Sequence, residues 1–155
     1  RHSMAYTTFQ NHSILLNGGI DCDNNFLPSN NENYIELIDS RQANVEKFLI
    51  KNSDEKFYSH QMKIMADDRR ILMIGGIGNQ KISNQINQID FRSMKIYSTK
   101  RIDIIDDNHL LMLHNFSCEL IKTNNNDNYL WTIGGGGNCF SFGTHFNPIL
   151  SIKID

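Results

Sequence analysis

The residues best equipped for chemistry lie close together near the end of the sequence. Polar and reactive side chains alternate there with aromatic ones, over residues 138–147. The polar members are Asn138, Cys139, Ser141, Thr144, His145 and Asn147, and the aromatic members are Phe140, Phe142 and Phe146. Aromatic planes stack on nucleobases while amides read base edges, so this segment is a candidate site for docking another domain or contacting a substrate. A structural role, with phenylalanines packed in a core and polar groups capping strands, stays open beside it.

Cys139 and His145 have the residue types of a catalytic nucleophile and its base. No carboxylate stands nearby in the sequence to orient the histidine, and the separation of the two residues does not imply contact. The cysteines are odd in number and have no C-x-x-C spacing; they are Cys22, Cys118 and Cys139. This pattern predicts neither a zinc site nor a disulfide framework, and it favours a reducing compartment. The sequence therefore predicts no catalytic residue and no metal site in this chain.

A repeated landmark organises the whole sequence. A short, mostly apolar run followed by two glycines occurs three times, at residues 14–19, 71–76 and 130–135. The period of about 60 residues indicates a repeated structural unit. The glycine pairs are Gly18-Gly19, Gly75-Gly76 and Gly134-Gly135. Glycine permits positive φ and close approach of neighbouring backbone, so we expect these pairs to be structural.

A histidine precedes each glycine pair, in a short strand-like stretch. These histidines are His2, His60 and His114. Because a position that recurs in every unit builds the unit, we expect the three to occupy equivalent structural positions, with the imidazole bonded to neighbouring backbone.

The segments around these landmarks read as short strands, with no sustained helical period. The apolar run before the glycines is the second strand of each unit. A third strand is predicted over 33–39 and 85–91, and a fourth over 45–50 and 94–98. The last unit has one further strand, over 149–154. Four short strands per unit predict an all-β fold built of propeller blades.

The glycine pair after an apolar second strand resembles the kelch-repeat family, whose repeats of roughly 50 residues build β-propeller blades. The resemblance implies a kelch-type β-propeller made of about three four-stranded antiparallel blades. The approximate blades are 1–52, 53–108 and 109–155, of which the last is incomplete. Propeller rings typically close with about four to eight blades. We therefore expect either a part of a larger propeller or a ring that a second copy of the chain completes.

Residues 134–148 carry a more specific resemblance. They read GGGGNCFSFGTHFNP, which is similar to the last kelch blade of the tRNA wybutosine-synthesizing protein 4 family and of related wybutosine synthesis fusions. The resemblance implies a propeller joined to a leucine carboxyl methyltransferase-like domain. Such enzymes use S-adenosylmethionine to methylate and methoxycarbonylate a modified guanosine beside the anticodon of phenylalanine tRNA. The cofactor would belong to the upstream domain, and none is expected to bind these residues.

Composition bears on the partners. The formal charge of −2 and the pI of about 6.3 give no electrostatic reason to expect a polyanion on the surface. The basic pairs Arg69-Arg70 and Lys100-Arg101 lie near aspartates, which predicts a mixed, solvated surface. No apolar run is long enough to span a membrane and no leader is visible, so we expect a cytoplasmic protein without a membrane partner.

The function that these patterns favour is positional. The resemblance implies the non-catalytic kelch region of a tRNA wybutosine-synthesizing methyltransferase-like protein, which would hold other domains of its own chain, or tRNA, in position. An alternative is a kelch module of an unrelated intracellular protein that binds another protein. A third interpretation is an enzyme in its own right. The sequence does not support it, because it shows no catalytic carboxylate pair, no triad and no spacing typical of metal ligands.

Overall fold

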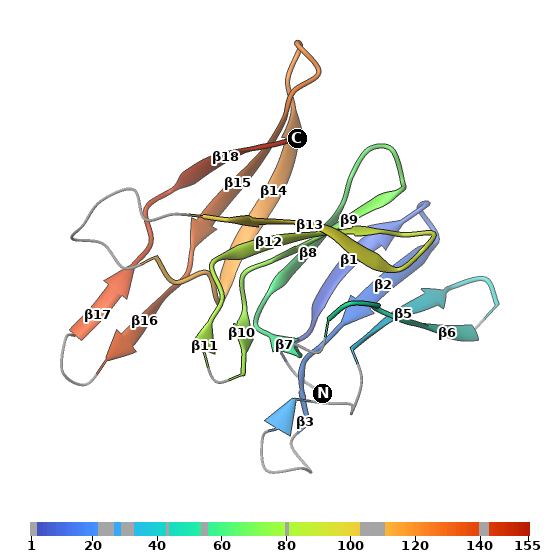
Figure 1. The fold of residues 1–155 in the computed structure, drawn as a ribbon, viewed down its shortest axis with the longest axis horizontal. Coiled ribbons are helices and arrows are strands. Elements are labelled where there is room, and N and C mark those ends of the chain that lie inside the picture. The colour runs from blue at the N-terminus through green and yellow to red at the C-terminus, as the bar shows by residue number, and fades with distance from the viewer. Residues whose placement is uncertain are drawn as a thin grey trace.

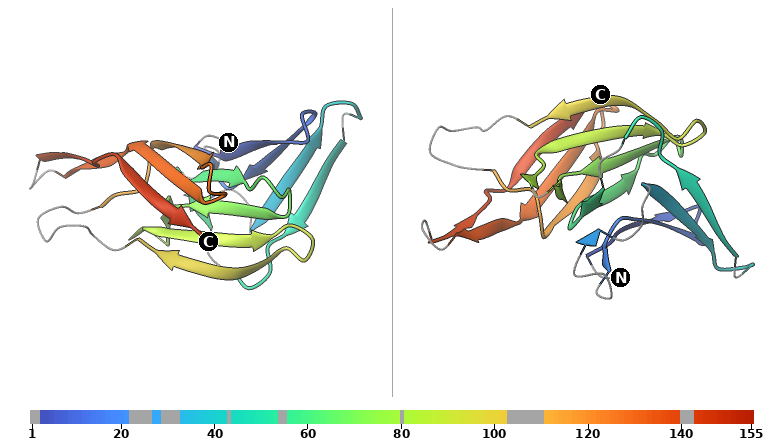
Figure 2. Two further views of the ribbon diagram at one scale, coloured as in Figure 1. Left: turned by 90° about the horizontal axis from the view of Figure 1, so that it is seen from above. Right: turned by 60° about the horizontal axis from the view of Figure 1, so that its bottom comes forward.

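The computed structural model describes residues 3–21, 27–28, 33–42, 44–53, 56–79, 81–102, 111–139 and 143–155. Every regular element within these ranges is a β-strand, so the all-β prediction is confirmed. Three antiparallel sheets make up most of the molecule (Figure 1). The second sheet lies between the first and the third (Figure 2), because it shares one apolar core with each of them.

The first two sheets each have four strands, and the strand order in each follows the order along the chain. The strands of the first sheet are β1 (Ala5–Phe9), β2 (Ser13–Asn17), β5 (Tyr34–Asp39) and β6 (Asn44–Leu49). The strands of the second sheet are β8 (Gln61–Ile64), β9 (Arg70–Ile74), β12 (Gln85–Asp90) and β13 (Lys95–Arg101). The predicted third and fourth strands of both units are therefore present, with slightly different bounds.

The third sheet has three strands in the described part of the chain: β14 (Phe116–Lys122), β15 (Asn128–Gly134) and β18 (Leu150–Ile154). The last of these is the strand predicted over 149–154. Shorter strands form three small sheets beside the main ones. They are β7 (Phe57–Tyr58) with β10 (Ile77–Gly78) and β11 (Lys81–Ile82), β16 (Gly136–Cys139) with β17 (Gly143–Phe146), and β3 (Ile20–Asp21) with β4 (Leu27–Pro28).

Burial distinguishes the middle sheet from the outer two. In β1 buried and exposed residues alternate, because only one face of the first sheet is covered. In β9 the four residues 71–74 are all buried, because the second sheet is covered on both faces. Leu15 and Met62 belong to the core between the first and second sheets, and Leu72 and Leu130 to the core between the second and third. Full burial of such a side chain stabilises the fold by roughly 1.5–3 kcal/mol.

The glycine pairs follow the second strand of each sheet, as predicted. Gly18 directly follows β2, Gly75 follows β9 and Gly134 ends β15, with φ of 68°, 61° and 77°. A Cβ atom at Gly18 would overlap the carbonyl oxygen of Phe57, and one at Gly75 would overlap that of Leu113. Both carbonyls belong to segments that lead into the next sheet, so glycine permits neighbouring sheets to approach closely here.

The strand register makes the three sheets comparable position by position. Pairs in the ladder between the first and second strands are Ala5 with Asn17, Gln61 with Ile74, and Ser117 with Ile133. In each pair the second residue directly precedes the first glycine of the repeat. Ala5, Gln61 and Ser117 are therefore equivalent, and counting along the strands from them relates every other position.

The strand register separates two of the three histidines that were predicted to be equivalent. His60 directly precedes Gln61, so its counterpart in the third sheet is Phe116, whereas His114 lies two residues earlier. Both histidines lie just before the first strand of their sheet and not within a strand. The turn between the first and second strands differs in length from sheet to sheet. The number of residues between a histidine and its glycine pair therefore does not give the position of that histidine relative to the first strand. His2 lies outside the described residues.

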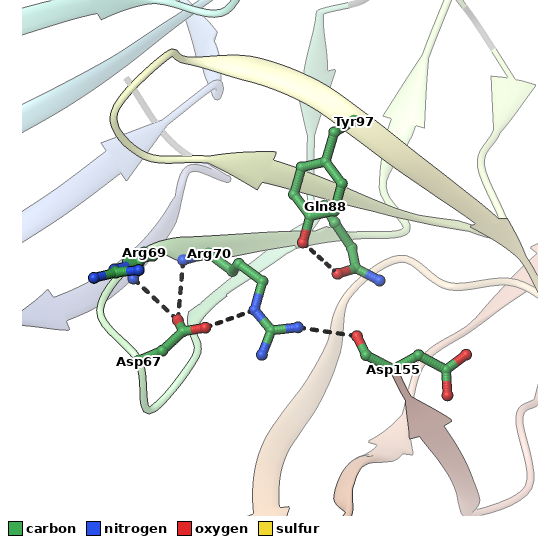
Figure 3. A network of polar contacts seen from close by, with 6 residues as sticks. All are labelled: Asp67, Arg69, Arg70, Gln88, Tyr97 and Asp155. Carbon is green, nitrogen blue, oxygen red and sulfur yellow. Dashed lines mark hydrogen bonds and ion pairs between the residues drawn. The ribbon is translucent and has the colours of Figure 1, made fainter.

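A polar network ties the second sheet to the third (Figure 3). The carboxylate of Asp67 accepts hydrogen bonds from the backbone amides of Arg69 and Arg70, at 3.0 and 3.3 Å, and from Arg70 Nε at 2.7 Å. The same guanidinium donates to the carbonyl oxygen of Asp155, just after β18, at 3.0 Å. Arg70 is therefore paired with an acid in a mixed surface network, as the sequence predicted.

Candidate functional site

The first strands of the three sheets, β1, β8 and β14, lie side by side, with β8 in the middle (Figure 1). Their side chains line a groove. One part of this groove has a volume of about 480 Å³. A second part, of about 270 Å³, shares lining residues with the first. The polar lining includes Thr7, Gln61, Lys63, Ser117 and Glu119. We call this feature the inner-strand groove.

Two repeated positions supply this polar lining. One position holds Gln61 in β8 and Ser117 in β14, and the position two residues on holds Thr7, Lys63 and Glu119. Residues i and i+2 of a strand lie on the same face, so both positions present their side chains to one side of each first strand. The groove is therefore a product of the repeat, built from equivalent residues of three sheets.

Two polar contacts bridge β8 and β14 in the groove. Lys63 Nζ lies 2.8 Å from Glu119 Oε2 in an ion pair, and Gln61 Nε2 donates a hydrogen bond to the carbonyl oxygen of Phe116 at 2.8 Å. The Glu119 side chain is 69% exposed, and an ion pair of this kind typically contributes less than about 1 kcal/mol to stability. Separating the pair therefore costs little, and each charged group can contact a ligand instead.

The one cysteine whose side chain the structure describes, Cys118, also borders the groove. It is buried, and burial raises the pKa of its thiol to about 11. At neutral pH the group is a thiol and not the thiolate that a nucleophile requires. The chemistry that these residues offer is hydrogen bonding and ion pairing, which is the chemistry of a binding site.

The segment predicted to act in docking forms the hairpin of β16 and β17. In its register Asn138 lies opposite Thr144, Cys139 opposite Gly143, and His145 opposite Gly137. Cys139 and His145 are therefore not cross-strand partners. Two further predicted residues, Ser141 and Phe142, lie outside the described part of the chain. The docking role of this segment stays a prediction.

Asn147, the last predicted docking residue, is buried, and its side chain forms hydrogen bonds with backbone groups. Its carbonyl oxygen accepts a hydrogen bond from the amide of Met112 at 3.0 Å. Its amide group donates to the carbonyl oxygens of Met112 and Gly134, at 2.7 and 3.2 Å. Asn84 binds the same segment in a similar way, since its side chain contacts the carbonyl of Leu111 and the amide of Leu113. Both asparagines hold the lead-in to the third sheet.

His60 is fully buried beside Phe57, with ring centroids 6.1 Å apart. Neither ring nitrogen has a hydrogen-bond partner among the residues that the structure describes, so the expected bond to neighbouring backbone is not found. Burial lowers the pKa of the imidazole to about 4, which keeps the ring neutral at pH 7. Burial also lowers the pKa of His114. His60 therefore has the properties of a core residue, whereas His114 is half-buried.

The groove residues were not identified from sequence, although a signal for them exists. Polar and apolar residues alternate over Gln61–Ile64 and again over 117–120, which is the pattern of a strand with one polar face. The glycine pairs drew attention to the second strand of each unit, whereas the groove belongs to the first. That the three first strands meet is a long-range contact, which alternation within one strand does not reveal.

No family model and no curated protein sequence matches the chain. In the described ranges, no helix has the length and apolar character needed to cross a membrane. The same ranges contain no group of three or more His, Cys, Asp or Glu side chains that could hold a metal ion. The candidate sites are therefore defined by geometry, as the inner-strand groove and the hairpin of β16 and β17.

Proposed function

We propose that the three sheets are neighbouring blades of a kelch-type β-propeller and that the chain acts by binding or scaffolding. The shared build of the sheets supports this fold: antiparallel strands in chain order, a glycine pair with positive φ after the second strand, and first strands that lie side by side. The observation that carries the functional proposal is the inner-strand groove with the Lys63–Glu119 ion pair in it. On this proposal the groove borders the central channel of the ring.

The groove suits a partner with hydrogen-bonding groups and charges of both signs. Lys63 can pair with a carboxylate of the partner and Glu119 with an ammonium or guanidinium group, once their mutual ion pair opens. Gln61 and Ser117 lie at the position next to this pair and supply neutral hydrogen-bonding groups. A peptide segment, such as a loop of another domain, has this chemistry.

The finer proposal is that this is the propeller region of a wybutosine-type tRNA methyltransferase, working in the cytoplasm. It rests on the resemblance of residues 134–148 to the last blade of that family. The propeller would hold the methyltransferase domain and tRNA relative to each other, and S-adenosylmethionine would be bound by the other domain. The hairpin of β16 and β17 extends away from the third sheet (Figure 1), and Phe146 on it is 75% exposed. An aromatic ring in that position is available for contact with another domain or a base.

A substitution in the hairpin tests the finer proposal in the full-length protein. Phe146→Ala should lower the rate of phenylalanine tRNA modification about tenfold, as the loss of an aromatic contact residue does. The melting temperature should stay unchanged, because the side chain is exposed and packs against little of the chain. The matched control is Ile149→Ala, which removes another exposed apolar side chain outside the hairpin and should change neither quantity.

Two results would contradict the proposal. If tRNA modification and thermal stability fall together in Phe146→Ala, the hairpin is a packing element and not a docking surface. If Phe146→Ala and Lys63→Glu both leave tRNA modification unchanged, the wybutosine assignment is wrong. In that case a kelch module that binds another protein becomes the better proposal.

A further inference from the structure

We infer that the outer faces of the first and third sheets bind each other between two copies of this chain, arranged head to tail. The face of the first sheet is marked by Tyr6, Ile14 and Val45, all of which are exposed. The face of the third sheet is marked by Ile121, Trp131 and Ile133, which are exposed as well. We call these the first-sheet face and the third-sheet face. The pairing of the two faces rests on the strand register, and the closure of six sheets into a ring rests on the proposed propeller fold.

The third-sheet face matches positions that are buried in the other two sheets. Trp131 is equivalent to Leu15 and Leu72 in the register described above. Trp131 is 40% exposed, whereas Leu15 and Leu72 are 0% exposed. Ile121 likewise is equivalent to Met65, which is buried. Leu15 packs between the first and second sheets, and Leu72 packs between the second and third. The face that carries this position is therefore covered in the first two sheets and uncovered in the third.

The first-sheet face shows the same contrast on the opposite side of a sheet. Tyr6 is 67% exposed, whereas its equivalent in the second sheet, Met62, is 0% exposed. Ile14 is exposed, whereas its equivalent Ile71 is fully buried. Met62 and Ile71 lie in the core between the second sheet and the first. The first-sheet face is therefore the counterpart of a surface that already receives a neighbouring sheet inside the chain.

The two exposed faces are two halves of one kind of interface. Within the chain, the Leu15 side of the first sheet packs on the Met62 side of the second. A third-sheet face placed on a first-sheet face would repeat this contact. The surroundings of Gly134 support the same contact. A Cβ atom at Gly18 or Gly75 would overlap the segment that leads into the next sheet, whereas a Cβ atom at Gly134 would meet no described atom within 4 Å. The space beside Gly134 is the space that such a segment fills in the other repeats.

A second copy of the chain supplies the partner for both faces at once. Two copies arranged head to tail cover the first-sheet and third-sheet faces of both copies, and six sheets fall within the size range of about four to eight in which propeller rings close. Exposed apolar faces of this kind favour association in water. The repeated interface inside the chain gives the geometry, since the contact between copies is a third occurrence of it.

Sedimentation equilibrium of the 155-residue chain, followed by its tryptophan fluorescence, tests this inference. The chain should form a dimer, and its emission should move to shorter wavelength as the dimer forms, because Trp131 is the single tryptophan and lies on the third-sheet face. Trp131→Lys and Tyr6→Lys should each weaken the dimer at least about tenfold, because each places a charge in the apolar interface. The control Ile82→Lys alters an exposed apolar residue of β11, outside both faces, and should leave the dimer intact.

A mixing experiment distinguishes head-to-tail contact from other arrangements. A mixture of Trp131→Lys and Tyr6→Lys chains retains one intact pair of faces, so it should form a heterodimer more stable than either homodimer. A wild-type chain that stays monomeric at all concentrations would overturn the inference. So would a dimer that survives both substitutions, or a mass that keeps growing with concentration, since the latter would show that the two copies do not close.

Discussion

His60 places a buried ionisable ring beside Phe57 of the core between the first and second sheets, and burial holds the pKa of this ring at about 4 against an ordinary value of 6.5. Between those two pH values the unfolded chain takes up a proton that the folded chain does not. The free energy of unfolding therefore has its full value above about pH 6.5 and decreases as the pH falls toward 4. A shift of this size corresponds to about 3 kcal/mol over that window. The burial of His114 acts in the same direction.

His60→Met should remove most of this acid sensitivity. The equivalent residue of the first sheet is Met4, which precedes Ala5 as His60 precedes Gln61, so the repeat already accommodates methionine at this position. Urea denaturation at pH 5 should show a free energy of unfolding about 1–3 kcal/mol higher than that of the wild type, with a smaller gain at pH 7.

The control for this prediction is Phe116→Met, at the equivalent buried position of the third sheet. It changes packing without removing a titratable group, so the pH dependence of unfolding should remain that of the wild type. If His60→Met retains the full pH dependence, the acid sensitivity has another origin.

At the level of the strands, most of the framework was predictable from sequence. The second strand of each unit was predictable because a short apolar run ends at a glycine pair, and the third and fourth strands because two short strand-like runs follow each pair. The small sheet of β7, β10 and β11 was not predicted, because two-residue strands leave no periodic pattern. The inner-strand groove was also missed, since it depends on contacts between strands that lie far apart in the sequence.

The glycine pairs give a matched test of how neighbouring sheets approach. Gly75 and Gly134 occupy equivalent positions with similar φ, of 61° and 77°, but only a Cβ at Gly75 would overlap a neighbouring backbone, at Leu113. When both substitutions are made in the monomeric Trp131→Lys chain, Gly134→Ala should therefore cost about 1 kcal/mol of stability, from the positive φ alone. Gly75→Ala should cost clearly more, at least about 2 kcal/mol, because the backbone of the next segment must also move. Urea denaturation of both variants gives the two values, and equal losses would contradict the close approach at Gly75.

At the level of the whole molecule, three equivalent sheets pack face to face with their first strands together. This arrangement creates both features on which function is proposed to depend. The groove exists because β1, β8 and β14 meet, and the exposed outer faces exist because the first and third sheets each have one uncovered side. Neither feature depends on the hairpin of β16 and β17, so the wybutosine proposal can fail while the repeat architecture stands.

Zero-length carbodiimide cross-linking with mass spectrometry tests that architecture most directly. The reagent joins an amine to a carboxylate only when the two are in contact, and Lys63 Nζ lies 2.8 Å from Glu119 Oε2 across the first strands of the second and third sheets. We predict a cross-link between Lys63 and Glu119 within one chain. Lys153 and Asp127, which are 2.9 Å apart within the third sheet, provide the positive control. A cross-link between Lys153 and Asp127 without one between Lys63 and Glu119 would show that the first strands do not meet, and the groove would not exist.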